Sequence, residues 1–84
     1  MTITEVNTIQ DLMNLDFEIK FSENFLTIDK NYSSLIVVEF PEEGFNITTL
    51  IKKAVKDKIN MVESDEYIDL NHHLDDLKEI LNIL

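Results

Sequence analysis

The chain contains one proline and one glycine, and both lie in the segment PEEGFN at residues 41–46. Proline cannot donate a backbone hydrogen bond to a sheet, and glycine favours turns, so the segment marks a structural break. The apolar residues are also spaced differently on its two sides. We therefore expect a sheet to end before residue 41 and helices to occupy the chain after residue 46.

The apolar residues before the break recur at every second position. Phe17, Ile19 and Phe21 alternate with polar neighbours, which predicts a strand with one solvated face. Residues 25–29 and 34–40 are predicted to form two further strands, with turns at 22–24 and 29–31. Connections this short require antiparallel pairing, so the expected sheet is a three-stranded meander.

A short helix is expected ahead of the sheet, from residue 4 or 8 to residue 14. Thr8 followed by Asp11 has the pattern of a helix start, because a hydroxyl can cap the helix and a carboxylate favours its positive end. Ile9, Leu12 and Met13 would then share one face of the helix.

A second helix is expected directly after the break, with Asn46 as its cap. Apolar residues follow helical spacing from Ile47 to Ile59. Lys52, Lys53 and Lys56 point away from this apolar stripe. They are either the solvated outer face of the helix or a functional basic patch.

A leucine-rich stripe ends the chain, and its members are spaced 3, 4, 3, 4 and 3 residues apart: Tyr67, Leu70, Leu74, Leu77, Leu81 and Leu84. This heptad spacing predicts a helix that begins after a Ser64 cap. The alternative is a short strand at 66–70 followed by a helix with an Asn71 cap. The predicted fold class is α+β, a single two-layer domain over residues 1–84 in the order α-β-β-β-α-α.

The formal net charge is −10, and the last 24 residues carry seven acidic side chains against one lysine. A field of this sign disfavours direct contact with nucleic acid or an anionic membrane, and steers the protein toward basic clefts. The absence of arginine disfavours phosphate chemistry. Without cysteine, a secretory signal or a membrane-length apolar run, we expect a cytoplasmic protein.

No arrangement of residues predicts catalysis, so we expect no enzyme activity, no catalytic residue and no cofactor. The serines lie in no nucleophile motif, and a single glycine cannot form a glycine-rich phosphate loop. His72 with Asp76, or Asp69 with His73, would share a helix face and could bind a divalent ion. Because adjacent histidines diverge by about 100° on a helix, both cannot join one site, and no metal site is predicted.

Acidic residues of the last segment would form a row opposite the leucine stripe if the segment were one helix. The row would contain Asp65, Asp69, His72, Asp76 and Glu79, with Glu63, Glu66 and Asp75 beside it. Its members would be about 5 Å apart along the axis, and like charges at this spacing repel. The row is either a solvated face that keeps the protein soluble or a binding surface that imitates a phosphate backbone.

The expected element order and the acidic run ESDEYIDLNHHLDD, residues 63–76, resemble the smallest phage and prophage anti-CRISPR proteins that inhibit the type II CRISPR nuclease. The resemblance implies that acidic residues stand in for DNA in the cleft that reads the PAM duplex. These residues are Glu63, Asp65, Glu66, Asp69 and Asp76. The lysines at 52–56 depart from this pattern, because they would have to point away from the partner or meet an acidic rim.

The sequence therefore predicts a non-enzymatic DNA mimic that blocks a basic nucleic-acid-binding protein or nuclease through an acidic C-terminal surface. The predicted contact residues are Glu63, Asp65, Glu66, Asp69, Asp75, Asp76 and Glu79. An immunity protein against a basic toxin nuclease would have the same features. The alternative is a structural or regulatory homodimer that pairs through the leucine stripe, although a monomer with that stripe in its own core is favoured.

Overall fold

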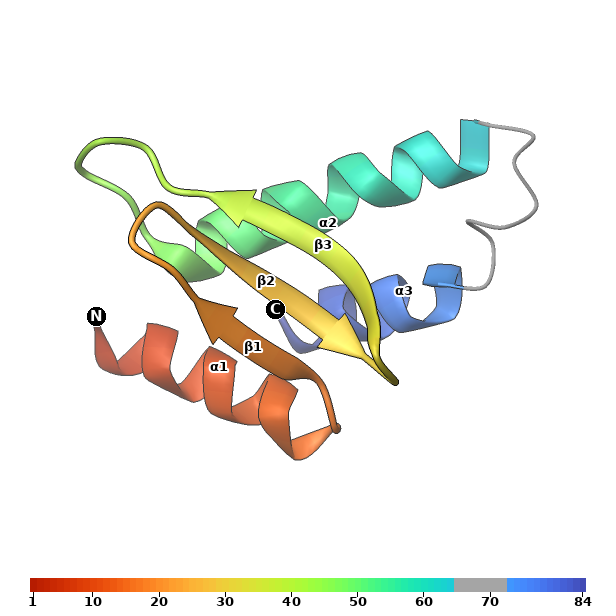
Figure 1. The fold of residues 1–84 in the computed structure, drawn as a ribbon, viewed down its shortest axis with the longest axis horizontal. Helices are drawn as coiled ribbons and strands as arrows, with labels where there is room; N and C mark the ends of the chain where they lie inside the picture. The colour runs from red at the N-terminus through yellow and green to blue at the C-terminus, as the bar shows by residue number, and fades with distance from the viewer. Residues whose placement is uncertain (65–72) are drawn as a thin grey trace.

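The chain folds into a three-stranded antiparallel sheet with helices packed against one of its faces (Figure 1). The structure is a computed structural model that describes residues 1–64 and 73–84. Its elements are α1 (Ile3–Asn14), β1 (Glu18–Phe21), β2 (Phe25–Lys30), β3 (Ser33–Glu39), α2 (Ile47–Ser64) and α3 (Leu74–Ile83). The predicted α+β class, element order and meander are confirmed.

The sheet has the strand order β1-β2-β3 and contains a bulge in β3. Ile28 pairs with Ile36 and Asp29 pairs with Ser34, so Leu35 has no partner on β2. Successive residues of a regular strand point to opposite faces, but the unpaired residue of a bulge breaks that alternation. Leu35 and Ile36 are consequently both buried, although they are neighbours in sequence.

Helix α1 begins at Ile3, close to the earlier of the two expected starts, and not after a Thr8 cap. Thr2 is its cap: the Thr2 hydroxyl accepts a hydrogen bond from the Glu5 N–H, and the Glu5 carboxylate accepts one from the Thr2 N–H at 2.8 Å. This reciprocal capping box satisfies two backbone donors at the helix start. Thr8 lies inside the helix, where its hydroxyl donates to the Thr4 carbonyl.

Glu5 also connects α1 to the start of α2. Its second carboxylate oxygen accepts a hydrogen bond from the Ile47 N–H at 2.7 Å, across 42 positions of sequence. The backbone donors of Thr2 and Ile47 lower the pKa of the carboxyl. The adjacent hydroxyls of Thr48 and Thr8 are hydrogen-bonded at 3.1 Å, so polar contacts join the two helices.

Helix α2 is capped by Asn46, as predicted, and continues past the predicted stripe to Ser64. The Asn46 side-chain oxygen accepts a hydrogen bond from the Thr49 N–H at 3.1 Å. The loop before the cap is closed by Phe40 and Phe45, whose rings stack with centroids 5.0 Å apart. Gly44 has a φ of 72° in this loop, a conformation that glycine adopts without strain.

Helix α3 corrects the prediction for the last segment. Ser64 does not cap a final helix, because it ends α2 and its hydroxyl donates to the Asn60 carbonyl. The final helix begins at Leu74 with His73 in the cap position, closer to the alternative that placed the start after Asn71. Asn71 and the alternative strand at 66–70 lie outside the described residues.

The core lies between the sheet and the helices. β2 and β3 contribute Leu26, Ile28, Ile36 and Val38, and the helices contribute, among others, Leu12, Ile51, Val55, Leu77 and Ile80. Leu74, Leu81 and Leu84 pack against this core. The described part of the leucine stripe therefore packs against the protein's own core, as the favoured interpretation expected.

The helices of residues 1–64 and 73–84 were also compared with the requirements for crossing a bilayer. None of them combines the necessary length with the necessary apolar character.

Candidate functional site

Glu63 and the acidic residues of α3 lie on two different helices, which meet at one end of the molecule. The carboxylate of Glu63, near the end of α2, is 3.4 Å from the ammonium of Lys78 on α3. Both side chains are about half exposed. Glu63, which was expected to flank a row on the last helix, belongs to α2, because α2 ends at Ser64 and α3 is a separate helix that begins at Leu74. Asp65, Glu66, Asp69 and His72 lie outside the described residues.

The orientation of α3 also differs from the prediction. Its fully buried residues are Leu77 and Ile80, whereas the predicted stripe contained Leu81 and omitted Ile80. At about 100° per residue, this turns the buried face so that Asp75 becomes the exposed carboxylate. Asp76 and Glu79 are half-buried at the margins of the helix instead of lying opposite the core.

Asp76 is held by a lysine of the sheet. Its carboxylate is 3.4 Å from the ammonium of Lys30, and the two side chains are only 26% and 19% exposed. The same ammonium lies 4.5 Å above the centroid of the Phe17 ring, a cation–π distance. Asp76 therefore joins α3 to the end of β2, and its charge is largely balanced within the protein.

The ion pair places the β2–β3 turn beside α3, and this turn has an unusual backbone. Asn31 and Tyr32 have φ values of 52° and 65°, the positive values that a two-residue I′ hairpin turn requires. Glycine is preferred at the second position, and an aromatic residue there is strained. Tyr32 is nevertheless fully exposed and gains no packing in return. The predicted turn at 29–31 was misplaced, because β2 continues to Lys30.

A shallow hollow of about 570 Å³ adjoins this turn on the α1 side. Its lining includes Asp16, Asn31 and Tyr32, which are all of the non-glycine residues with positive φ in the described chain. Strained backbone conformations tend to gather at functional sites. Glu18 and Met13 also contribute to the lining. Sequence reasoning missed this surface. The one local signal was the Asn31-Tyr32 pair between two strands, which marks the position of the turn that borders the hollow.

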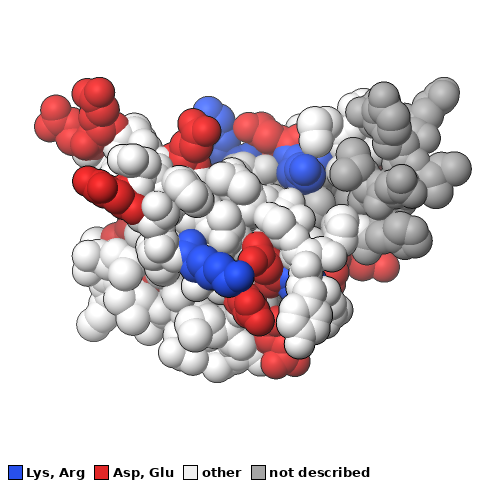
Figure 2. Space-filling model, viewed as in Figure 1, with Lys and Arg blue, Asp and Glu red and all other residues white. Residues whose placement is uncertain are grey.

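The acidic groups of the molecule are not confined to one row. Figure 2 shows red acidic atoms around the visible rim, including a cluster over the loop that joins β3 to α2. Of the 17 acidic residues, three lie outside the described part, which leaves 14. Only Glu18, Asp29, Glu63 and Asp76 are within 4.0 Å of a described lysine nitrogen. The other ten have no ammonium partner among the described residues.

The four predicted contact residues within the described part of the chain thus divide into those without a lysine partner, one in an exposed ion pair and one in a largely buried ion pair. Asp75 is exposed and Glu79 half-buried, and neither has a lysine partner in the described part of the chain. Glu63 shares an exposed ion pair and Asp76 a largely buried one. Within residues 1–64 and 73–84, no three histidine or carboxylate side chains are grouped so that they could hold a metal ion.

Comparisons of the chain with protein-family models, with curated proteins and with solved structures found no match.

Proposed function

We propose that the protein is a non-enzymatic inhibitor that occupies the DNA-binding cleft of a basic nucleic-acid-handling protein, as a small anti-CRISPR protein does to the type II CRISPR nuclease. The main support is a set of nine carboxylates outside the core that have no ammonium partner among the described residues, in a chain of net charge −10. The tenth such carboxylate, Glu5, is buried and cannot meet a partner. Unpaired exposed carboxylates increase the rate of encounter with a basic cleft.

The contact surface in this proposal is the end of the molecule where α2 and α3 meet (Figure 1). Asp75 and Glu79 belong to it, and the sequence between the two helices adds Asp65, Glu66 and Asp69. We also assign Tyr32 to this surface. It lies in the turn directly after Lys30, which is paired with Asp76 of α3, and it is fully exposed. Tyrosine is common among the residues that dominate interface energies. Asp76 supports the surface by holding α3 to the sheet.

The test is competition for DNA. A type II CRISPR nuclease loaded with guide RNA is mixed with PAM-containing duplex and increasing amounts of the protein, and bound duplex is measured. We expect inhibition that weakens as salt rises, because screening at physiological ionic strength acts beyond about 8 Å. Replacing Asp65, Asp69 and Asp75 with Asn should raise the inhibitory concentration at least tenfold, roughly the effect of losing 1.4 kcal/mol of binding.

A control variant removes the same number of charges elsewhere. Asp11→Asn, Glu42→Gln and Glu43→Gln alter exposed residues of α1 and of the loop before α2. This variant should inhibit nearly as well as the original protein. If the two triple variants lose inhibition equally, only net charge matters and the assigned surface is wrong. If the original protein does not displace DNA, the proposed mimicry of the CRISPR target is wrong.

A further inference from the structure

The outer edge of β3 carries backbone groups that no other strand within residues 1–64 and 73–84 uses. β3 is the last strand in the order β1-β2-β3. Directly after the end of β3, the Phe40 N–H donates a hydrogen bond of 2.8 Å to the Asn24 carbonyl in the β1–β2 turn, which shows which residues of β3 face β2. In an antiparallel ladder, alternate residues turn their N–H and C=O groups to the same neighbour. Val38 and Ile36 therefore bond to β2, while Val37 and Glu39 direct theirs outward. The edge can accept a further strand.

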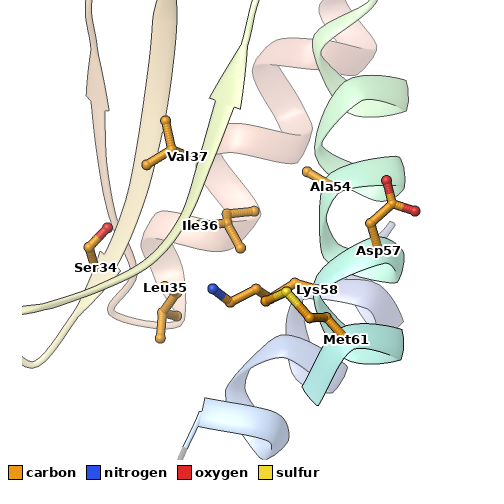
Figure 3. A pocket seen from close by; sticks show the side chains of 8 residues that line it. All are labelled: Ser34, Leu35, Ile36, Val37, Ala54, Asp57, Lys58 and Met61. Atoms are coloured by element: carbon orange, nitrogen blue, oxygen red, sulfur yellow. The ribbon is translucent and has the colours of Figure 1, made fainter. Parts of the chain in front are cut away.

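A groove of about 520 Å³ runs between this edge and α2. Figure 3 shows Ile36 pointing from β3 toward α2, with Ala54, Lys58 and Met61 on the helix side, while the Val37 side chain points from β3 away from α2. Val37 is 56% exposed and Met61 is 44% exposed. An added strand would cover these apolar side chains as well as form backbone hydrogen bonds, the combination by which other proteins bind extended peptides between a sheet edge and a helix.

Lys58 determines which charge the groove accepts. Its side chain is half-buried and extends from α2 toward β3 in Figure 3. No carboxylate of the described residues lies within 4.0 Å of its ammonium, although the protein has far more acids than lysines. Asp57 also lines the groove, so one carboxylate lies beside this ammonium.

We propose that this groove binds an extended peptide segment of a protein partner, which adds to β3 as a fourth strand. On its helix side the segment presents one apolar side chain to Met61 and one carboxylate to Lys58. A single carboxylate is favoured, because Asp57 and the net charge of −10 disfavour more. The bulge at Leu35 limits regular pairing to the Val37–Glu39 part of the edge.

The first experiment selects peptides from a random hexapeptide library displayed on phage, with the full-length protein immobilised. We expect enrichment of sequences that alternate apolar residues with one aspartate or glutamate at a constant position. Against a Lys58→Glu variant, the same position should become lysine or arginine. Against Lys56→Glu, the matched control on the exposed face of α2, the selected sequences should not change.

The second experiment locates the peptide. A selected peptide, synthesised with blocked ends, is titrated into isotope-labelled protein. The Val37 and Glu39 amide signals should shift, and their exchange with solvent should slow at least tenfold. Lys58→Gln should weaken binding of the glutamate peptide at least fivefold, while a peptide with glutamine at that position binds both proteins equally.

Three results would overturn the proposal. One is a library selection that enriches no alternating acidic sequence. Another is an enriched set that is the same for the original protein and for Lys58→Glu. The third is a peptide whose shifts map away from the β3 edge. A dispersed amide spectrum from each lysine variant establishes that it is folded, so that lost binding reports on the groove.

Discussion

The Glu5 side chain completes the hydrogen bonding at the starts of two helices. Its carboxylate accepts backbone hydrogen bonds from Thr2, the cap of α1, and from Ile47 at the start of α2. Helix starts leave N–H groups without intrahelical partners, so these two bonds satisfy donors that would otherwise need water. The residue is 5% exposed, which excludes most of that water. A charged residue is therefore buried because it completes the backbone bonding of both helices.

The stability of the protein should depend on pH through Glu5. Its two backbone bonds place its folded-state pKa below the unfolded value. Such a carboxylate adds stability above the unfolded pKa and loses that stability as the pH falls through the folded pKa. We expect Glu5→Gln to lower the melting temperature at pH 7, because an amide lacks the charge and turns an N–H group toward a donor.

The readout is the melting temperature measured from neutral pH down to about pH 2, below the unfolded pKa of a glutamate. The original protein should lose more stability over the acid range than Glu5→Gln does. Asp11→Asn serves as the control, since Asp11 is exposed on the same helix. Parallel acid profiles for the original protein and Glu5→Gln would show that the Glu5 hydrogen bonds do not produce the pH dependence.

We expect Tyr32 to destabilise the fold because of its backbone conformation in the β2–β3 turn. It has a positive φ of 65° and no burial, so replacement by glycine removes strain without removing packing. We expect Tyr32→Gly to raise the free energy of unfolding by about 1 kcal/mol in urea titrations. Tyr32→Ala retains the Cβ atom and should change it by less than about 0.5 kcal/mol. A loss of stability in Tyr32→Gly would mean that the ring packs on the protein.

At the level of elements, the sequence predicted the sheet well because alternation and short turns are local signals. The residue ranges of all strands were close to those observed. The start of α1 at Ile3 is close to the earlier of the two expected starts, but its cap was missed although Thr2 and Glu5 have the T-x-x-E spacing of a capping box. The boundary between α2 and α3 was missed because leucines at heptad spacing fit one long helix as well as two shorter ones. Met61 and Val62 lie in α2, which continues to Ser64, and not in a connection before the last helix.

The charged contacts between elements could not be predicted. Lys30 and Asp76 are 46 residues apart, and their meeting depends on how α3 rotates to bury Leu77 and Ile80. The sequence therefore presented Asp76 as a free carboxylate, although the fold uses it. Glu63 was likewise expected to flank the last helix, whereas it lies in α2 and pairs with Lys78 of α3. Local periodicity predicts faces of a helix, but it does not predict which residue of another element lies against them.

The Lys30–Asp76 pair should contribute measurably to stability, and the Glu63–Lys78 pair should not. The first pair is mostly shielded from water and the second is half exposed. A double-mutant cycle with Lys30→Met and Asp76→Asn should give a coupling energy of about 1 kcal/mol or more in urea unfolding. The matched cycle with Lys78→Met and Glu63→Gln should give less than about 0.5 kcal/mol. Equal coupling energies would contradict the assigned role of Asp76.

At the level of the whole molecule, the charge that would attract a basic partner also repels itself. The protein measures 37 × 27 × 21 Å, so charges interact across it when the screening length is about 30 Å, as at 0.01 M salt. At 1 M salt this length is about 3 Å. The ten unpaired carboxylates outnumber the ion pairs that salt would weaken, so net repulsion should dominate.

We therefore expect the melting temperature to rise with sodium chloride between about 0.01 M and 1 M. The variant Glu42→Gln with Glu43→Gln removes two charges from an exposed loop and should show a smaller rise. A melting temperature that falls with salt would mean that attraction within the ion pairs outweighs repulsion. That result would also weaken the argument that the carboxylates are left free for a partner.

The bulge in β3 identifies the position where the chain could change length with little effect on its neighbours. Pairing is regular on both sides of Leu35, with Ile36 opposite Ile28 and Ser34 opposite Asp29. A homologous or engineered chain without Leu35 could retain every one of these partners and lose a single core side chain. Removal of any other residue within β3 would shift part of the strand by one position and exchange its inner and outer faces.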